Sequence, residues 1–363
     1  MFSNSRRGLS VLILLSMIWI LPAPASDRPA HTYLNELTPL DNPPPLLADH
    51  PEYVQPVEDV HRFEAPILID DESADLSVRA WRFSYNARGI IEVPNRLDGA
   101  KTAIIMVHPW GVDDGQGWKM PTPAGVAFGC TFEKNDLIRR HAAEVVNPFL
   151  KKLRDDAALV LYSLPRSPDP IRLKLYRSID HTPTPEERAT ARIALTEKLE
   201  DFDYTGQPIP AEIPITGKPA VDYFRAFPGL DAGPHYNGEG FWELPIPVMS
   251  SIDVHDEDVV FYDEQGYPAL RDFLGQQGIE HVLLCGYATD MCVCETTAGY
   301  KNLKKDFNTF LVGDAVQATL PANKTAAYAT NQAVSYAALN LLITQASWVQ
   351  PIADGERPVA GER

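Results

Sequence analysis

Residues 281–299 read HVLLCGYATDMCVCETTAG, and the rest of the chain can be understood outward from them. The apolar run Val282 to Cys285 has the length and composition of a strand that is buried on both faces of a parallel sheet. Gly286 ends this run, and Thr289 and Asp290 are favoured residues for capping the start of a helix. The spacing therefore predicts a strand, a tight turn and a helix that continues to about residue 305.

Cys292 would lie in the first turn of this helix. The positive end of the helix dipole stabilises a thiolate there, and the free N–H groups of a first turn can hold an anion. A nucleophilic sulfur beside free N–H donors is the minimum equipment for acyl transfer. Because cysteine is also among the most buried residue types, position alone leaves an ordinary core residue as the alternative.

The segment 286–298, GYATDMCVCETTA, closely resembles the nucleophile motif of the isochorismatase-like cysteine hydrolases, a superfamily that includes nicotinamidases and N-carbamoylsarcosine amidases. The likeness continues through 310–315, FLVGDA, which is similar to that family's next strand. It is clear over 258–349 and weaker over 101–163, and it does not cover the first hundred residues or 165–250. The resemblance implies a three-layer α/β/α sandwich with a mainly parallel sheet, to which this chain adds an N-terminal β extension and a long insertion.

The family's catalytic residues are an Asp, a Lys and a Cys at three neighbouring strand ends. Cys292 matches the nucleophile. The apolar run 103–107 ends in His108 where the family has its Asp, and the run 258–262 leads into Asp263 where the family has its Lys. A neutral imidazole can take the proton of a thiol, and a carboxylate can orient that imidazole, so the two changes make sense together as a rebuilt relay.

Other interpretations stay open at this point. The chain could be a decayed relative that keeps the fold and binds without turnover. Asp113 and Asp114, on the loop after the first parallel strand, are alternative acids, whereas Asp70 is disfavoured because no β-α-β order follows it. Vinyl-ether hydrolysis of the isochorismatase type can proceed without the Cys in this superfamily, and it ranks last because the Asp that it needs is absent.

The resemblance also implies how a substrate would be held. Ala288 and Cys292 would supply the two N–H groups of an oxyanion hole, and the Tyr287–Ala288 peptide bond would be cis. Asp314 matches a family Asp that is taken here as structural. The candidate lining of the substrate pocket comes from the loop after the first parallel strand: Trp110, Asp113 and Trp118.

The sequence lacks the motifs that bind a metal or a nucleotide cofactor. The Asp-x-x-x-His loop of nicotinamidases, expected after the second strand, is replaced by residues 163–166, SLPR. Neither a phosphate-binding Gly-x-Gly-x-x-Gly pattern nor a Walker pattern occurs. We therefore predict no catalytic metal and no cofactor, and a cysteine hydrolase that cleaves a C–N bond of a small molecule through a thioester.

The first 25 residues have the pattern of an export signal. Arg6 and Arg7 precede an apolar run from Leu9 to Leu21, and Ala23-Pro24-Ala25 follows as a cleavage site, which is the layout of a secretory signal peptide. We expect cleavage after Ala25 and a periplasmic or extracellular protein with no membrane attachment. The net charge of −17 argues against nucleic acid and anionic membranes as partners. A homo-oligomer is left open.

The remaining sequence predicts the domain organisation. A proline-rich arm and an antiparallel β element occupy 26–99, with strands near 67–69, 76–83 and 89–93. The hydrolase domain spans 100–349 and is interrupted by an insertion at 165–250, which contains a charged helix at 185–199. Helices are expected at 137–153, where Pro148 could split the helix, and at 323–346, and 350–363 is expected to be a disordered tail. The four cysteines, Cys130, Cys285, Cys292 and Cys294, form no disulfide framework.

Overall fold

One sheet of strands organises the structure, a computed structural model that describes residues 32–58, 60–109, 132–203, 205, 243–289, 291–318 and 345–352. All elements below lie in the unit formed by residues 33–363. The strands are β1 (Thr38–Pro39), β2 (Arg62–Glu64), β3 (Leu76–Ser84), β4 (Gly89–Leu97), β5 (Thr102–Val107), β6 (Leu159–Leu164), β7 (Arg177–Ser178), β8 (Val259–Tyr262), β9 (His281–Tyr287), β10 (Asn308–Gln317) and β11 (Gln345–Pro351). Their order across the sheet is β1-β2-β4-β3-β11-β10-β9-β5-β6-β8-β7.

The seven strands from β11 to β7 in this order run parallel to one another. Every residue of β5, β6, β8 and β9 is buried, as expected for parallel strands that are covered on both faces. Two separate hydrophobic clusters lie against the two faces, one around Ile104 and Leu283 and the other around Ile105 and Leu284. The predicted α/β sandwich with a mainly parallel sheet is confirmed.

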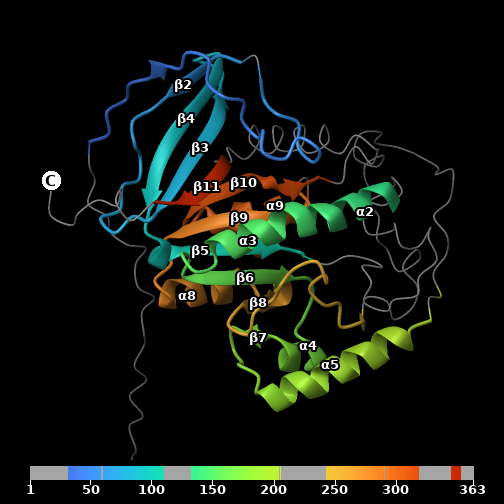
Figure 1. Cartoon of the computed structure of the whole chain (residues 1–363). Coiled ribbons are helices and arrows are strands. Elements are labelled where there is room, and N and C mark those ends of the chain that lie inside the picture. The colour runs from blue at the N-terminus through green and yellow to red at the C-terminus, as the bar shows by residue number, and fades with distance from the viewer. Residues whose placement is uncertain are drawn as a thin grey trace, which may run out of the picture. The chain divides into compact units, whose positions relative to one another are not determined.

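Helices complete the outer layers of the sandwich (Figure 1). On one face lie α2 (Phe132–His141), the π-helical turn η3 (Ala142–Val146) and α3 (Asn147–Leu153), which contribute Ile138, Val146 and Leu150 to the first cluster. Pro148 lies where the π-helical turn η3 meets α3, and because it has no N–H it interrupts the helical hydrogen-bond pattern at this junction. The other face is covered by α8 (Tyr267–Gln276), through Leu270 and Leu274.

The helix predicted after Thr289 is wrong in length. It forms two single turns, α9 (Cys292–Glu295) and α10 (Tyr300–Leu303), which are separated by residues 296–299. Thr296 and Thr297 interrupt the helix because their hydroxyls donate to Asp263 at the end of β8. Among the described residues, neither Met291 nor the predicted cap Thr289 caps α9 with its side chain, and Asp290, the other predicted cap, lies outside the described residues.

The predicted N-terminal β extension is present, and it continues the same sheet as the parallel strands. β3 pairs antiparallel with β4 on one side and with β11 on the other, so the hairpin extends the parallel strands (Figure 1). β11 runs to Pro351, which corrects both the predicted helix through Ala346 and the start of the predicted tail at 350. Residues 67–69 form no strand, and only a single bridge joins Asp70 to Arg96.

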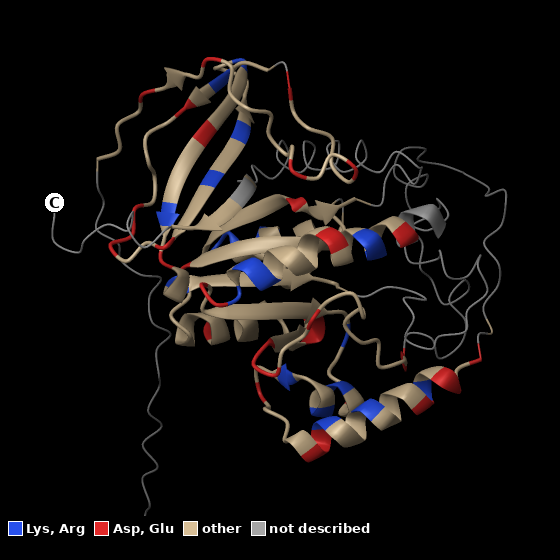
Figure 2. Ribbon diagram, in the orientation of Figure 1, with Lys and Arg blue, Asp and Glu red and all other residues tan. Residues whose placement is uncertain are grey.

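The described part of the insertion contains α4 (Pro170–Leu175), β7 and α5 (Pro185–Glu200), whose charged helical pattern had been predicted. Acidic and basic side chains alternate along α5, whereas the parallel strands carry almost no charge (Figure 2). A capping box of Thr184 and Glu187 starts α5. In the part of the chain that the structure describes, no helix is long and apolar enough to cross a membrane.

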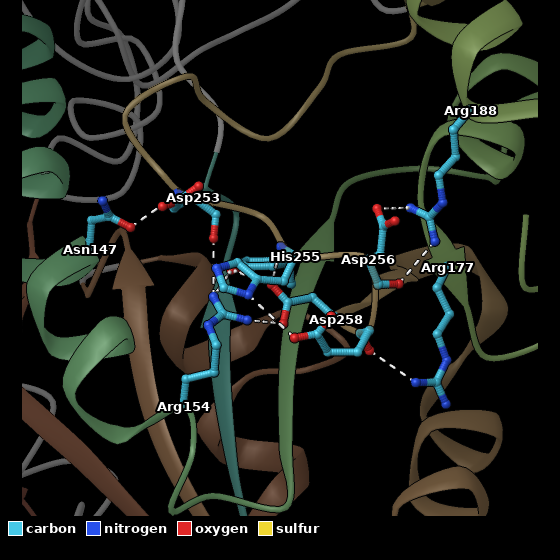
Figure 3. A network of polar contacts seen from close by, with 10 residues as sticks. Asn147, Arg154, Arg177, Arg188, Asp253, His255, Asp256 and Asp258 are labelled. Atoms are coloured by element: carbon cyan, nitrogen blue, oxygen red, sulfur yellow. Dashed lines mark hydrogen bonds and ion pairs between the residues drawn. The ribbon is translucent and has the colours of Figure 1, made fainter. Parts of the chain in front are cut away.

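A polar network fastens the insertion to the rest of the molecule (Figure 3). Its centre is an ion pair between Arg154, at the end of α3, and Asp258, which also accepts a hydrogen bond from Tyr162 at 3.0 Å. Arg177 and Arg188 add hydrogen bonds to backbone oxygens of the same segment at 2.9 Å each. The network positions the residues that lead into β8, and therefore the strand end that carries Asp263.

Candidate active site

The carboxyl ends of β5, β6, β8 and β9 bring the candidate residues together. β5 and β9 are neighbours, but the chain continues from β5 to β6 on one side and from β9 to β10 on the other. In open α/β sheets, ligands bind in the crevice that such a reversal creates at the carboxyl ends of the strands. His108 follows β5, Asp263 follows β8 and Cys292 follows β9.

Local backbone geometry at these ends makes room for the site. His108 has φ +48°, a left-handed conformation that is uncommon for residues other than glycine, and its N–H donates to Ser163 O at 2.9 Å. Gly286 has φ +110°, and a Cβ atom built on it would lie 2.2 Å from Val107 O. Only glycine permits this close approach of β9 to β5.

His108 contacts Asp263 and is influenced by Cys292. Its Nε2 lies 2.8 Å from Asp263 Oδ2, and Cys292 interacts electrostatically with its ring. The His108 side chain is 10% exposed and that of Asp263 is 17% exposed, so little water competes for their contact. Cys292 is half-buried at the start of α9 and can be reached from solvent. The structure therefore pairs the imidazole with the carboxylate, in a place where the Cys292 sulfur acts on the same ring.

The charges of the pair reinforce each other. Burial alone would lower the pKa of His108, but hydrogen bonds to Asp263 and Cys292 outweigh it and raise the pKa to about 9. Burial alone would raise the pKa of Asp263, but the hydrogen bond from His108, helped by Thr296 and Ser163, leaves the pKa below its ordinary value. At neutral pH the pair is thus an imidazolium and a carboxylate.

Two donors to the Asp263 carboxylate had not been predicted. Ser163 Oγ donates to Oδ1 at 3.1 Å, and Thr296 Oγ1 donates to Oδ2 at 2.6 Å. The sequence held a signal for each. Ser163 lies near the end of the strand between β5 and β8, and Thr296 is four residues after Cys292, one helical turn along the chain.

The backbone around the sulfur has free donors. Among the described residues, neither the Ala288 N–H nor the Cys292 N–H has a backbone acceptor, whereas Met291 and Val293 both donate to Ala288 O at 3.1 Å. The Tyr287–Ala288 peptide bond is cis, as the family resemblance implied. Two N–H groups next to the thiol that have no backbone acceptor among the described residues are suitable donors for an oxyanion hole.

The other candidate residues from the sequence lie away from this site or outside the described residues. Trp110, Asp113 and Trp118 lie outside the described residues, as do Asp114 and Cys130. Asp70 pairs with Arg96 of β4 at 2.7 Å. Asp314 is buried in β10, where burial raises its pKa to about 8, so it is neutral at pH 7.

The residues after β6 do not fit a metal site. The chain there reads Ser163 to Arg166 and supplies no Asp or His ligand. Nowhere in the described ranges are three or more His, Cys, Asp or Glu side chains grouped so that they could hold a metal ion. The prediction that the protein works without a metal stays a prediction.

A relay of acid, imidazole and thiol beside free N–H groups defines the class of site found in cysteine hydrolases. Residues 253–341 match the family model described as the isochorismatase domain. This segment of the chain is therefore isochorismatase-like, which confirms the resemblance inferred from the motif around Cys292. No curated protein matches the sequence.

Solved structures match about two thirds of this chain at low sequence identity and low TM-score. A cysteine hydrolase from Pseudomonas syringae pv. phaseolicola shares 16% identity over 67% of this chain and 87% of its own, with a TM-score of 0.33. A nicotinamidase from Staphylococcus aureus shares 12% sequence identity over 68% of this chain and 99% of its own, with a TM-score of 0.30. A protein from L. infantum in complex with nicotinate shares 13% sequence identity over 69% of this chain and 93% of its own, with a TM-score of 0.33.

Proposed function

We propose that the protein is a cysteine hydrolase that cleaves an amide-type C–N bond of a small molecule through a thioester on Cys292. The observation that carries this proposal is the buried His108 ring, which is hydrogen-bonded to Asp263 at 2.8 Å and interacts electrostatically with Cys292. Nothing in a binding domain would require a buried imidazolium between an acid and a half-exposed thiol. The isochorismatase domain match supports the same class of chemistry.

The proposed cycle has two halves. The proton shared by Cys292 and His108 resides on the ring, and the sulfur attacks the substrate carbonyl carbon. The N–H groups of Ala288 and Cys292 hold the oxyanion, and the ring gives its proton to the nitrogen as the C–N bond breaks. Water then attacks the thioester, the ring takes a proton from that water, and the sulfur leaves as the acid is released.

Asp263 has a supporting role in this cycle. Its carboxylate holds Nε2 of His108, and the proposal assigns proton exchange with the sulfur and the substrate to the other ring nitrogen, Nδ1. It also stabilises the positive charge on the ring, as the acid of a hydrolase triad does. Asp263→Asn should therefore reduce turnover less than His108→Ala, because the amide can still orient the ring.

The test is capture of the acyl-enzyme. The protein is incubated with a panel of small amides, and acylation of Cys292 is read by intact mass and peptide mapping, with hydroxylamine added to release the acyl group. Wild type should form an adduct on Cys292. His108→Ala should lose about 10²- to 10⁴-fold in the acylation rate. Cys294→Ala is the matched control, because that buried thiol donates to Thr289 O and should not alter acylation.

The contrary result would favour the alternative of a binding domain. If Cys292 takes no acyl group from any amide, and His108→Ala does not change its alkylation by iodoacetamide at pH 7, the relay has no chemical role. Retained binding of a small molecule in the same samples would then identify a domain that keeps the fold without turnover.

We also propose that the protein is exported and works in the periplasm or outside the cell. The support is the layout of residues 1–25, with its basic start, apolar run and Ala-Pro-Ala site. N-terminal sequencing of the protein from the cell envelope should give Ser26 as the first residue. Recovery of protein that still begins at Met1 would contradict export by cleavage.

A further inference from the structure

The Asp263 carboxylate is held by more than its histidine partner. Oδ1 accepts from Ser163 Oγ at 3.1 Å, and Oδ2 accepts from both Thr296 Oγ1 at 2.6 Å and His108 Nε2 at 2.8 Å. Thr297 Oγ1 donates to the backbone oxygen of the same residue at 2.9 Å. A short loop residue is thus fixed from three directions, by β6, by the end of β5 and by the turn after α9.

We propose that Thr296 and Ser163 are positioning residues, which fix the orientation of the Asp263 carboxylate so that Oδ2 is directed at the His108 ring. This inference rests on the proposed function for its catalytic meaning, although the hydrogen bonds themselves do not depend on it. Neither residue is assigned to touch the substrate.

The geometry explains why two hydroxyls are needed. A carboxylate that faced only His108 could rotate about its χ2 angle and leave the ring with a poorly directed partner. One donor on each oxygen fixes the plane of the carboxylate, and hydroxyl donors add negative-charge stabilisation in a place where water is scarce. The titratable groups bonded to the ring are Asp263 at the end of β8 and Cys292 at the start of α9.

Thr296 should matter more than Ser163. Its hydroxyl shares Oδ2 with His108, and its contact is shorter, so its loss acts directly on the oxygen that faces the ring. Ser163 acts on the far oxygen, Oδ1. Removing either donor should let the carboxylate turn away from the ring, which weakens its attraction for the imidazolium and so lowers the pKa of His108.

The experiment is an NMR titration of His108 in the full protein with labelled histidine, in which the signal is assigned by its loss in His108→Gln. Thr296→Val should lower the pKa of His108 by about one pH unit, and Ser163→Ala by about half as much. Thr296→Ser, which restores the hydroxyl, should return the pKa to the wild-type value. Thr309→Val is the matched control, because this buried hydroxyl of β10 donates to Phe307 O, away from the relay.

The outcomes separate the two proposals. A pKa that stays within about 0.2 units in Thr296→Val, or that falls equally in Thr309→Val, overturns the positioning role even if Cys292 is acylated. A pKa that falls in Thr296→Val and returns in Thr296→Ser supports it even if no amide acylates Cys292, which would reject only the proposed function.

Where turnover is measurable, the loss of activity in Thr296→Val should appear in kcat with little change in KM. If Thr296→Val does not fold, Ser163→Ala carries the same test on the other oxygen, and an unshifted His108 pKa in that variant overturns the proposal.

Discussion

At the scale of single residues, the position of His108 between a carboxylate and a thiol makes stability depend on pH. Folding raises the pKa of this ring from 6.5 to about 9, although burial opposes the shift. A raised pKa contributes stability that is fully present below the unfolded pKa and is lost as the pH rises through the folded pKa. The window is therefore about pH 6.5 to 9, and the shift corresponds to about 3 kcal/mol.

The free energy of unfolding should accordingly differ between wild type and His108→Gln in a pH-dependent way. We expect the advantage of wild type to be largest near pH 6 and to shrink steadily toward pH 10, because the variant has no ring to hold the proton. Urea unfolding of both proteins at intervals of one pH unit measures the two free energies of unfolding. Their difference removes the contribution of groups that titrate equally in both proteins. An advantage that grows with pH, or that stays constant, would contradict the assigned pKa.

Sequence reasoning reached His108 and Asp263 because each directly follows an apolar strand at a position where the resembled family has a catalytic residue. Cys292 was reached from its motif, which resembles the family's nucleophile motif, so the family resemblance was what grouped the three residues. Ser163 and Thr296 could not be found in this way, since whether a hydroxyl points at a carboxylate depends on side-chain directions across three separate segments. The catalytic roles themselves stay predictions until acylation is measured.

At the scale of elements, the approach of β9 to β5 sets the position of the sulfur. Gly286→Ala should destabilise the protein by about 2 kcal/mol or more, because the added Cβ would meet Val107 O at 2.2 Å and φ is +110°. Gly275→Ala in α8 is the matched control. Its Cβ would have no neighbour within 4 Å, so a helix-favouring alanine should be neutral or stabilise by up to about 1 kcal/mol.

Thermal and urea unfolding of the two variants would make this comparison. Equal stability of Gly286→Ala and wild type would show that β5 and β9 can separate without loss. In that case the sulfur would not be held in register with His108 by the packing of these two strands, and the relay geometry would need another cause.

Elements were predictable where local signals agreed with each other. Runs of apolar residues gave β5, β6, β8 and β9, and the charge pattern gave α5. The helix after Cys292 was predicted too long because helix spacing says nothing of two threonine hydroxyls that find a partner on another strand. Tertiary contacts set the length of that helix, and a local sequence pattern does not reveal such contacts.

At the scale of the whole molecule, the N-terminal extension and the parallel strands share one hydrogen-bonded sheet. β11 joins them, since it pairs with β10 on one side and with β3 on the other. The buried His281 side chain adds a link, because its Nε2 lies 2.8 Å from Asp71 Oδ2. This joining was missed from the sequence because it pairs segments far apart in the chain, and pairing partners leave no mark in the periodicity of either strand.

Hydrogen exchange should therefore report one cooperative unit. We expect the slowest amides of β3 and of β5 to exchange with opening free energies within about 1 kcal/mol of each other, because opening β3 strips a partner from β11. Mass spectrometry of exchanged peptides can measure both strands in one sample. Exchange of β3 at a much lower free energy would show that the extension opens by itself.

The strands at the two ends of the sheet have a consequence for the protein at high concentration. An open strand edge is a template on which another chain can add a strand, and it is a common start of aggregation. In the described part of this chain both outermost strands, β1 and β7, are only two residues long, and β1 includes Pro39, which has no N–H to offer. A large sheet with so little open backbone should resist edge-to-edge association, which would suit a protein that has to remain dispersed while it waits for a substrate.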